Sequence, residues 1–247
     1  MVCVMTGTEG QFKPVCVMLT SLKENADFRY DVRVYHKGID ETQKEILNRL
    51  FNAEVLEYKR DWKFCGRYTS LAFSKYECLS LLEKYDKVLW LDTDVIVEKP
   101  IGVLIAMKDE LCASRDILSL RSSFLPEYRD SILEGTGFNT GVLLFGSSIK
   151  NPMMIKGWCE RKTEEIGKYL NFAEQGILNL AWREFNIPIN YVGREYNTPG
   201  AFSGDIDGAK ILHFFGPKKP WKMKVSNKRA QARWEYWQSK FQERLTA

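Results

Sequence analysis

The stretch Val88-Leu89-Trp90-Leu91-Asp92-Thr93-Asp94-Val95-Ile96-Val97 places two aspartates inside an otherwise apolar run. The apolar residues predict a short buried strand over Lys87–Leu91 that continues after the acidic pair over Val95–Val97. Side chains alternate along extended chain, so Asp92 and Asp94 are expected to point to the same side. Open α/β sheets bind ligands beyond the carboxyl ends of their strands. The two carboxylates are therefore expected at a ligand-binding edge.

Two neighbouring carboxylates form a hard oxygen site that suits Mg²⁺ or Mn²⁺. An ion held there can bridge a diphosphate and offset the charge that develops when a nucleotide diphosphate departs. The Asp-x-Asp pattern alone also fits solvated aspartates in a turn. It fits the nucleophile loop of aspartate-based phosphatases as well, although Ile96 stands where those enzymes have Thr or Val. The apolar flanks favour a functional pair, because carboxylates beside a core need a partner.

Runs of strand length alternate with segments of helical length on both sides of the acidic pair. Further strands are predicted at Val2–Met5, Tyr30–Tyr35, Glu54–Tyr58, Phe138–Phe145, Ile187–Val192 and Ile211–Phe215. Helices are predicted at Pro14–Glu24, Glu41–Phe51 with Asp40 as N-cap, Ser70–Tyr85 with Ser70 as N-cap, Pro152–Lys168 and Ala173–Glu184. This order predicts an α/β fold with a mostly parallel central sheet flanked by helices. The long loops Ser119–Thr136 and Gly193–Gly208 are expected to shape a substrate site.

The composition is that of an ordinary globular protein with a substantial core. The 247 residues are 45% hydrophobic and 28% charged, and no apolar run is long enough to span a bilayer. No leader is visible at the start, and the cysteines form no C-x-x-C pair. Reduced thiols in a cytoplasmic protein are therefore expected, and zinc or thioredoxin-like motifs are not. The six cysteines are Cys3, Cys16, Cys65, Cys78, Cys112 and Cys159.

Basic residues gather at the end of the chain. The net charge of +4 combines +7 from Lys218 onward with −3 over residues 1–217. We expect one catalytic domain over residues 1–225 and a basic aromatic helix over residues 226–247, capped by Ser226 or Asn227. Its aromatic residues recur every three or four positions, so the helix either docks on its own domain or lies on an anionic membrane surface. A single basic helix does not favour nucleic acid.

Four blocks of sequence occur in an order typical of one enzyme family. The chain resembles the family 8 glycosyltransferases, which include glycogenin, galactinol synthase and bacterial lipooligosaccharide galactosyltransferases. The resemblance implies a GT-A fold and a transfer that retains the configuration of the donor sugar. The blocks are Leu91-Asp92-Thr93-Asp94, Gly137-Phe138-Asn139-Thr140-Gly141-Val142, Glu174-Gln175-Gly176-Ile177-Leu178-Asn179, and His213-Phe214-Phe215-Gly216-Pro217-Lys218-Lys219-Pro220-Trp221.

The resemblance also implies roles for individual residues. Asp92, Asp94 and His213 would bind Mn²⁺, or Mg²⁺ as the alternative, whereas His213 seen alone would be a core or loop histidine. Gly216 and Lys219 would hold the donor diphosphate. The remaining donor-binding positions are Thr93, Lys75 and the turn Thr6-Gly7-Thr8, which would face the uracil of a UDP-sugar.

Three further positions are expected near the reacting carbon of the donor sugar. Asn139 would face the sugar, and Gln175 would lie beside the carbon. The family usually has aspartate where this chain has Glu174, so the sugar preference is open. Same-face attack assisted by the leaving phosphate is the favoured route, and Glu174 as a covalent nucleophile is the alternative.

The expected function is transfer of a hexose or pentose from a UDP-sugar to an unidentified acceptor. The acceptor can be a sugar, a lipid-linked molecule, a polyol or a protein, and both a homodimer and membrane contact through residues 226–247 stay open. Self-glycosylation at Tyr196 is not favoured, because Arg194-Glu195-Tyr196-Asn197-Thr198 does not resemble the acceptor segment of glycogenin. The alternatives are a metal-dependent phosphatase or phosphotransferase and a catalytically silent UDP-sugar-binding protein.

Overall fold

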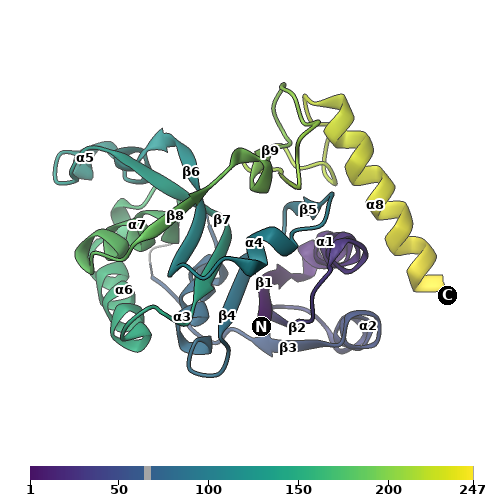
Figure 1. The fold of residues 1–247 in the computed structure, drawn as a ribbon, viewed down its shortest axis with the longest axis horizontal. Helices are drawn as coiled ribbons and strands as arrows, with labels where there is room; N and C mark the ends of the chain where they lie inside the picture. Colours follow the sequence, from purple (N-terminus) through teal and green to yellow (C-terminus); the bar gives the residue numbers. More distant parts are fainter. Residues whose placement is uncertain (64–67, 247) are drawn as a thin grey trace. The chain divides into compact units, whose positions relative to one another are not determined.

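The computed structural model describes residues 1–63 and 68–246, so Cys65 lies outside the described residues. The chain forms two compact units (Figure 1). The first unit comprises Met1, Tyr58–Trp90 and Met107–Val192, and the second comprises Val2–Glu57, Leu91–Ala106 and Gly193–Ala247. The expected α/β class with mostly parallel strands and flanking helices is confirmed. The expected boundary near residue 225 stays a prediction.

The second unit begins with three parallel strands. They are β1 (Val2–Thr8), β2 (Asp31–Lys37) and β3 (Ala53–Glu57), in the order β3-β2-β1. The connecting helices are α1 (Phe12–Asn25) and α2 (Glu41–Phe51). The predicted cap of α2 is confirmed, because the Asp40 carboxylate accepts a hydrogen bond from the Gln43 amide at 2.8 Å.

A separate three-stranded sheet in the second unit carries the acidic pair. It contains β5 (Val95–Val97), β10 (Ile211–His213) and β9 (Thr198–Pro199), with β10 antiparallel to β5 and parallel to β9. The prediction that β5 continues β4 (Lys87–Leu91) is therefore wrong. The chain turns between these strands, and the Val95 amide bonds the Asp92 carbonyl at 3.2 Å.

The C-terminal helix α8 (Lys228–Thr246) packs beside α1 (Figure 1). Asn227 caps it, since its Oδ1 accepts a hydrogen bond from the Ala230 amide at 3.1 Å. The Trp234 ring contacts Phe214, and Trp237 Nε1 donates to Glu98 at 2.5 Å. Helix α8 thus docks on the protein itself. Its buried aromatic side chains are not available to membrane headgroups.

The first unit contains an irregular antiparallel pair of strands. Its strands are β4, β7 (Thr136–Gly146), β6 (Leu111–Ser119) and β8 (Ile189–Val192), in the order β4-β7-β6-β8. β6 runs antiparallel to β7 with register shifts between Ala113 and Ser119, and parallel to β8. Strand β6 is not predicted from the sequence, because these shifts break the alternation of buried and exposed residues.

The predicted helix Ser70–Tyr85 is wrong in form. The structure has a 3-10 segment η2 (Ser70–Tyr76), a short helix α3 (Glu77–Leu81) and then turns. Ser70 does not cap it, since its hydroxyl donates to Asp61 at 3.2 Å. Residues Phe73 to Tyr76 are all buried. Because no polar face alternates with a buried one, the sequence pattern cannot distinguish a 3-10 helix from an α-helix here.

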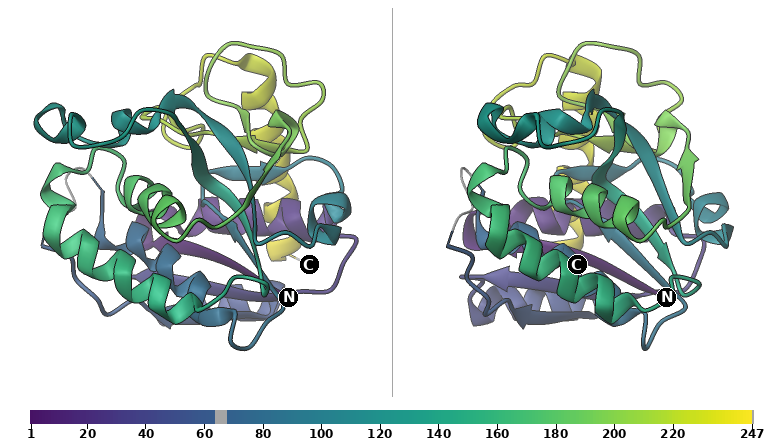
Figure 2. Two further views of the ribbon diagram at one scale, coloured as in Figure 1. Left: turned by 60° about the vertical axis from the view of Figure 1, so that its left-hand side comes forward. Right: turned by 90° about the vertical axis from the view of Figure 1, so that its left-hand side faces the viewer.

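Two longer helices, α6 (Pro152–Ile166) and α7 (Glu174–Glu184), pack together in the first unit (Figure 2). No helix of the described residues is both long and apolar enough to cross a membrane. The five cysteines among them are buried. The remaining short elements are η1 (Glu9–Gln11), α4 (Gly102–Ala106), η3 (Leu120–Ser123), α5 (Pro126–Arg129), η4 (Gly167–Tyr169) and η5 (Arg194–Tyr196).

Candidate functional site

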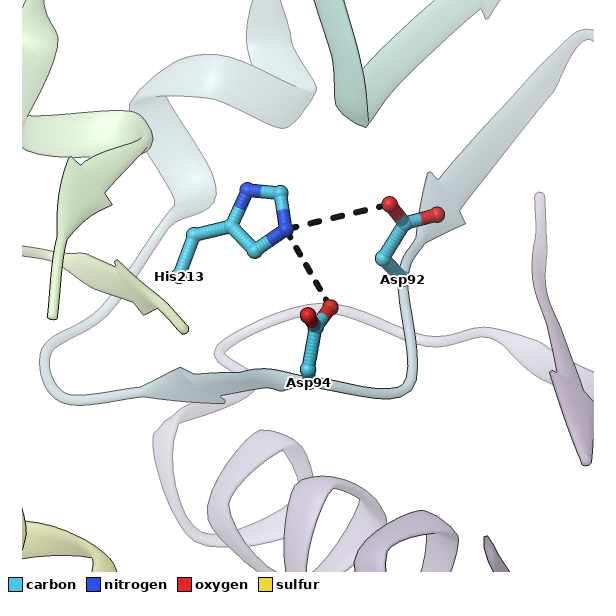
Figure 3. Close-up of side chains that lie close together, drawn as sticks. All are labelled: Asp92, Asp94 and His213. Atoms are coloured by element: carbon cyan, nitrogen blue, oxygen red, sulfur yellow. Dashed lines mark ion pairs between the residues drawn. The ribbon is translucent and has the colours of Figure 1, made fainter. Parts of the chain in front are cut away.

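Asp92, Asp94 and His213 converge in the second unit, and we call them the Asp-Asp-His cluster (Figure 3). One donor atom from each lies within 4.8 Å of the others. His213 Nε2 is 3.8 Å from Asp92 Oδ2 and 3.2 Å from Asp94 Oδ1. These three side chains therefore offer two oxygens and one nitrogen toward a common point, which is a suitable donor set for a divalent cation.

The convergence follows from strand pairing. His213 pairs with Val95 in the antiparallel ladder of β10 and β5, and the Phe214 amide bonds the Asp94 carbonyl at 2.8 Å. The expectation that the aspartates lie on extended chain is wrong, because Thr93 and Asp94 form a turn. The turn brings both carboxylates to the end of β10.

Lys219 is the cation beside this cluster. Its Nζ bonds Asp94 Oδ2 and also donates to the Phe214 carbonyl at 2.8 Å. Burial alone would raise the pKa of Asp94, but His213 and Lys219 outweigh it and hold the pKa well below its ordinary value. Asp94 is therefore ionised at neutral pH, as a metal ligand must be.

The segment after His213 contains a glycine in the left-handed region of backbone conformation. Gly216 has a φ of +93°, a conformation that L side chains rarely adopt. Pro220 accepts a hydrogen bond from Gln231 of α8, and the Trp221 ring packs on Trp234 at 5.0 Å between centroids. Pro220 and Trp221 thus hold this segment against α8.

The turn at the end of β1 is joined to the acidic pair. The Thr93 hydroxyl donates to the Thr6 carbonyl at 2.6 Å. A Cβ at Gly7 would lie 3.0 Å from Val15, so glycine fits the close packing there. The Thr8 hydroxyl donates to the Gln11 side chain at 3.2 Å. A hydrogen bond therefore joins the turn that contains Thr6 and Gly7 to Thr93 of the acidic pair in the second unit.

The other predicted positions gather in the first unit. Lys75 Nζ lies 2.5 Å from Glu174 Oε1, and the two residues are only 3% and 4% exposed. Lys75 also donates to the Thr140 carbonyl at 2.8 Å and lies over the Trp90 ring. The Thr140 hydroxyl donates to Glu174 at 2.9 Å. Lys75 is thus a buried partner of a carboxylate rather than an exposed helix lysine.

Gln175 is held from both ends of its amide. Its Nε2 donates to Asp116 Oδ2 at 2.7 Å, and its Oε1 accepts from the Thr140 amide at 3.2 Å and Asn139 Nδ2 at 3.4 Å. Asn139 Oδ1 accepts from the Gly141 amide at 3.0 Å. Asp116 lies on β6, so the sequence analysis missed it together with its strand.

Tyr196 and Asn197 are adjacent residues of the second unit with different partners. Tyr196 is buried, and its hydroxyl is bonded by Lys210 Nζ at 2.9 Å, which does not favour it as a sugar acceptor. Asn197 Oδ1 lies 2.8 Å from His213 Nδ1, a contact that the sequence analysis missed. The 15 residues between Asn197 and His213 carry no sequence pattern that predicts this contact.

The α/β fold with an Asp-x-Asp turn beside a histidine is that of a GT-A glycosyltransferase. The chain belongs to glycosyl transferase family 8, whose family model matches residues 2–224. The Asp-x-Asp motif thus belongs to a transferase family, which disfavours the phosphatase alternative.

Individual relatives are distant in sequence. Glycosyltransferase GlyD of Streptococcus pneumoniae is 24% identical over 211 residues, which cover 76% of this chain and 24% of GlyD. Glycogenin-1 of Mus musculus is 23% identical over 235 residues, 88% of this chain and 64% of glycogenin-1. The chain therefore spans about a quarter of GlyD and less than two thirds of glycogenin-1.

A solved structure shares the fold over nearly the whole chain. The galactosyltransferase LgtC, in complex with donor and acceptor sugar analogues, superposes with a TM-score of 0.75 at 19% identity. The match covers 97% of this chain and 95% of LgtC. At this identity the likeness establishes the fold and leaves donor and acceptor open.

Proposed function

We propose that this chain transfers a sugar from a UDP-sugar to an acceptor hydroxyl, with Mn²⁺, or Mg²⁺ as the alternative, as its metal. The observation that carries the proposal is the Asp-Asp-His cluster, whose donor atoms lie within 4.8 Å of one another. Membership of glycosyl transferase family 8 supports the reaction class. The family resemblance, which implies that Thr6-Gly7-Thr8 faces the base, supports a uracil nucleotide.

The residues present fit a hard divalent cation. Asp92 and Asp94 supply carboxylate oxygens and His213 supplies Nε2, a mixed shell that suits Mn²⁺. A cation held by these residues would supply positive charge that stabilises a departing diphosphate. Lys219 bonds Asp94, and Gly216 follows the end of β10 by three residues, which supports a diphosphate next to that cation.

Lys219 is proposed to change partners when the donor binds. It now neutralises Asp94, which a cation would do instead once it is held by the cluster. Its ammonium is then free to bond a phosphate oxygen, and the Gly216 backbone can approach the phosphate closely because it carries no Cβ. Both groups stabilise the leaving diphosphate.

The transfer step is proposed to occur on one face of the sugar. The bond between the anomeric carbon and the phosphate oxygen breaks, and its electron pair stays on that oxygen. The acceptor oxygen bonds the same face of the carbon, and its proton passes to the departing phosphate. The ion pair of Glu174 with Lys75 supports this route, because a covalent intermediate on Glu174 would require that buried pair to open.

A panel of UDP-, GDP- and ADP-sugars tests the proposal. Thermal shift and donor hydrolysis are measured with each donor in Mn²⁺ and in EDTA. We expect UDP-sugars with Mn²⁺ to raise the unfolding temperature and to be hydrolysed slowly, and EDTA to abolish both effects. Stabilisation without hydrolysis or transfer would support the silent binding protein, and turnover of simple phosphate esters would support the phosphatase. Preference for another nucleotide would overturn the choice of UDP.

The acceptor is proposed only as a hydroxyl compound. Sugar, polyol, lipid-linked and protein acceptors all fit the reaction, and each can be added to the panel once a donor is known. Membrane contact would have to use the outer face of α8, because Trp234, Trp237 and Phe241 pack inward.

A further inference from the structure

Asn197 lies behind the histidine of the Asp-Asp-His cluster. Its Oδ1 is 2.8 Å from His213 Nδ1, while Nε2 on the other side of the ring faces Asp94. Asn197 is 7% exposed and His213 is 2% exposed, so water has little access to this contact. The imidazole is therefore held between a neutral amide and two carboxylates.

The chemistry of the contact fixes where one proton sits. A neutral imidazole has one N–H and one nitrogen lone pair, and an amide oxygen can only accept a hydrogen bond. His213 Nδ1 must therefore donate to Asn197 Oδ1. The lone pair is then on Nε2, the nitrogen that faces the two aspartates and can bind a metal.

Without Asn197 the opposite arrangement would be favoured. Asp94 Oδ1 is 3.2 Å from Nε2, and a carboxylate is a stronger hydrogen-bond acceptor than an amide oxygen. With no acceptor at Nδ1, a neutral ring would keep its proton on Nε2 and donate it to Asp94. That proton would occupy the position that a metal ion needs.

The backbone keeps Asn197 in register with His213. Strand β9 follows Asn197 directly and pairs with β10, and the Gly200 amide bonds the His213 carbonyl at 2.8 Å. On the other side, the Lys210 amide bonds the Glu195 carbonyl at 2.7 Å. Backbone hydrogen bonds thus flank Asn197 on both sides.

From these contacts we infer that Asn197 is a positioning residue, which keeps a proton on His213 Nδ1 and so reserves Nε2 for a divalent cation. The inference rests on the proposed function, because it assumes that the Asp-Asp-His cluster holds a metal. It adds to the metal shell a residue outside the four sequence blocks. Outer partners of this kind typically change metal affinity 10–100-fold.

Three variants separate positioning from stability. Asn197→Leu removes the acceptor, and Asn197→Asp keeps an oxygen acceptor at the same place. Asn227→Leu is the matched control, because Asn227 is also a buried asparagine but bonds Gly204 and Ala230 at the start of α8. Mn²⁺ affinity is measured by titration calorimetry at pH 8, and stability by urea unfolding in EDTA.

We expect Asn197→Leu to weaken Mn²⁺ binding roughly 10–100-fold and Asn197→Asp to stay within about threefold of the original protein. Asn227→Leu should lower stability without changing Mn²⁺ affinity. Equal Mn²⁺ affinity in Asn197→Leu and the original protein would overturn the inference. Loss of binding in Asn197→Asp as well would also overturn it. If the original protein itself binds no Mn²⁺, the proposed function fails instead.

The proton can be observed directly, with or without metal, because the chain has only two histidines. In ¹⁵N-histidine NMR at pH 8, His213 should carry a proton on Nδ1 and keep it when Mg²⁺ is added. His36 provides the opposite reference, since its Nδ1 accepts from the Ile39 amide at 3.2 Å and its proton must sit on Nε2. His36→Gln assigns the signals.

In Asn197→Leu the His213 proton should move to Nε2. An unprotonated Nδ1 in the original protein would refute the inference even if the metal site is real. This measurement needs no donor, no acceptor and no transfer activity.

Discussion

Two polar clusters, one in each unit, differ in whether their charges are balanced. In the first unit Lys75 and Glu174 neutralise each other inside the protein, and Thr140 forms a hydrogen bond with each of them. In the second unit Asp92 and Asp94 both face His213, and Lys219 bonds Asp94. The second cluster thus brings two carboxylates together, and their negative charge is available for a cation to balance.

This difference predicts that substitutions in the two clusters have different effects on stability and on ligand binding. A buried ion pair that is already balanced loses stability when one partner is removed, because the other charge stays buried and unpaired. An unbalanced anionic cluster gains little stability from its own carboxylates and exerts its effect when a cation binds. Substitutions should therefore change folding in the first unit and ligand binding in the second.

The largest effect is expected for Asp92→Asn, which removes one charged oxygen donor from the Asp-Asp-His cluster. A cation that stabilises the leaving group by several kcal/mol would be lost, so turnover should fall on the order of 10³-fold and Mn²⁺ binding should disappear. Stability in EDTA should change little. Donor hydrolysis measures turnover and calorimetry measures Mn²⁺ binding. The control is Asp130→Asn, at an exposed position. If Asp92→Asn kept its Mn²⁺ affinity, Asp92 would not be a ligand of the metal ion.

Lys75→Met tests the balanced cluster and should mainly reduce stability. It leaves Glu174 buried without its cation, which costs about 3–5 kcal/mol, and the double variant Lys75→Met/Glu174→Gln should recover part of the loss. Urea unfolding in EDTA measures the change. Lys44→Met, which breaks an exposed pair with Glu41, should cost no more than about 1 kcal/mol.

An unchanged stability in Lys75→Met would contradict the balanced-pair interpretation. Glu174→Gln alone also tests mechanism: near-normal transfer would exclude an essential carboxylate at this position.

The sequence pattern indicates the acidic pair correctly, but its expected geometry is wrong. The apolar runs around Asp92 and Asp94 marked a strand end, but the two residues converge through a turn and not through strand alternation. His213 came only from the family resemblance, because a lone histidine carries no spacing signal. Its approach to the aspartates depends on the pairing of β10 with β5, which is a long-range contact.

The parts that local sequence could not predict share one cause. β6 has register shifts that remove its alternation, and Asp116 was missed with it. Asn197 follows a short 3-10 segment, and only the β9–β10 pairing brings it to His213. Helix α2 was predicted to the residue because its capping box is local. Neighbouring residues in the sequence are enough to predict a local feature such as a helix cap, but they do not predict contacts that depend on long-range strand pairing.

Lys219→Met is expected to separate donor binding from metal binding in the unbalanced cluster. Loss of a charged hydrogen bond to phosphate should reduce donor turnover roughly 10–100-fold. Mn²⁺ affinity should hold or increase, because the ammonium that now bonds Asp94 is gone. Lys218→Met changes an exposed neighbouring lysine and serves as control. A parallel loss of Mn²⁺ affinity would mean that Lys219 supports the metal site instead of the diphosphate.

The smallest effect concerns His36, a buried group outside both clusters. Burial lowers the pKa of His36 below its ordinary 6.5, so the unfolded chain binds a proton that the folded protein resists. Stability should therefore fall as the pH drops below about 6.5, by no more than about 1.4 kcal/mol per pH unit for one proton. Urea unfolding between pH 7.5 and pH 5.5, in EDTA, compares the original protein with His36→Gln, in which this component of the slope should vanish. If both proteins lose stability equally, the acid sensitivity belongs to the carboxylates, and the Asp-Asp-His cluster becomes the first place to look for it.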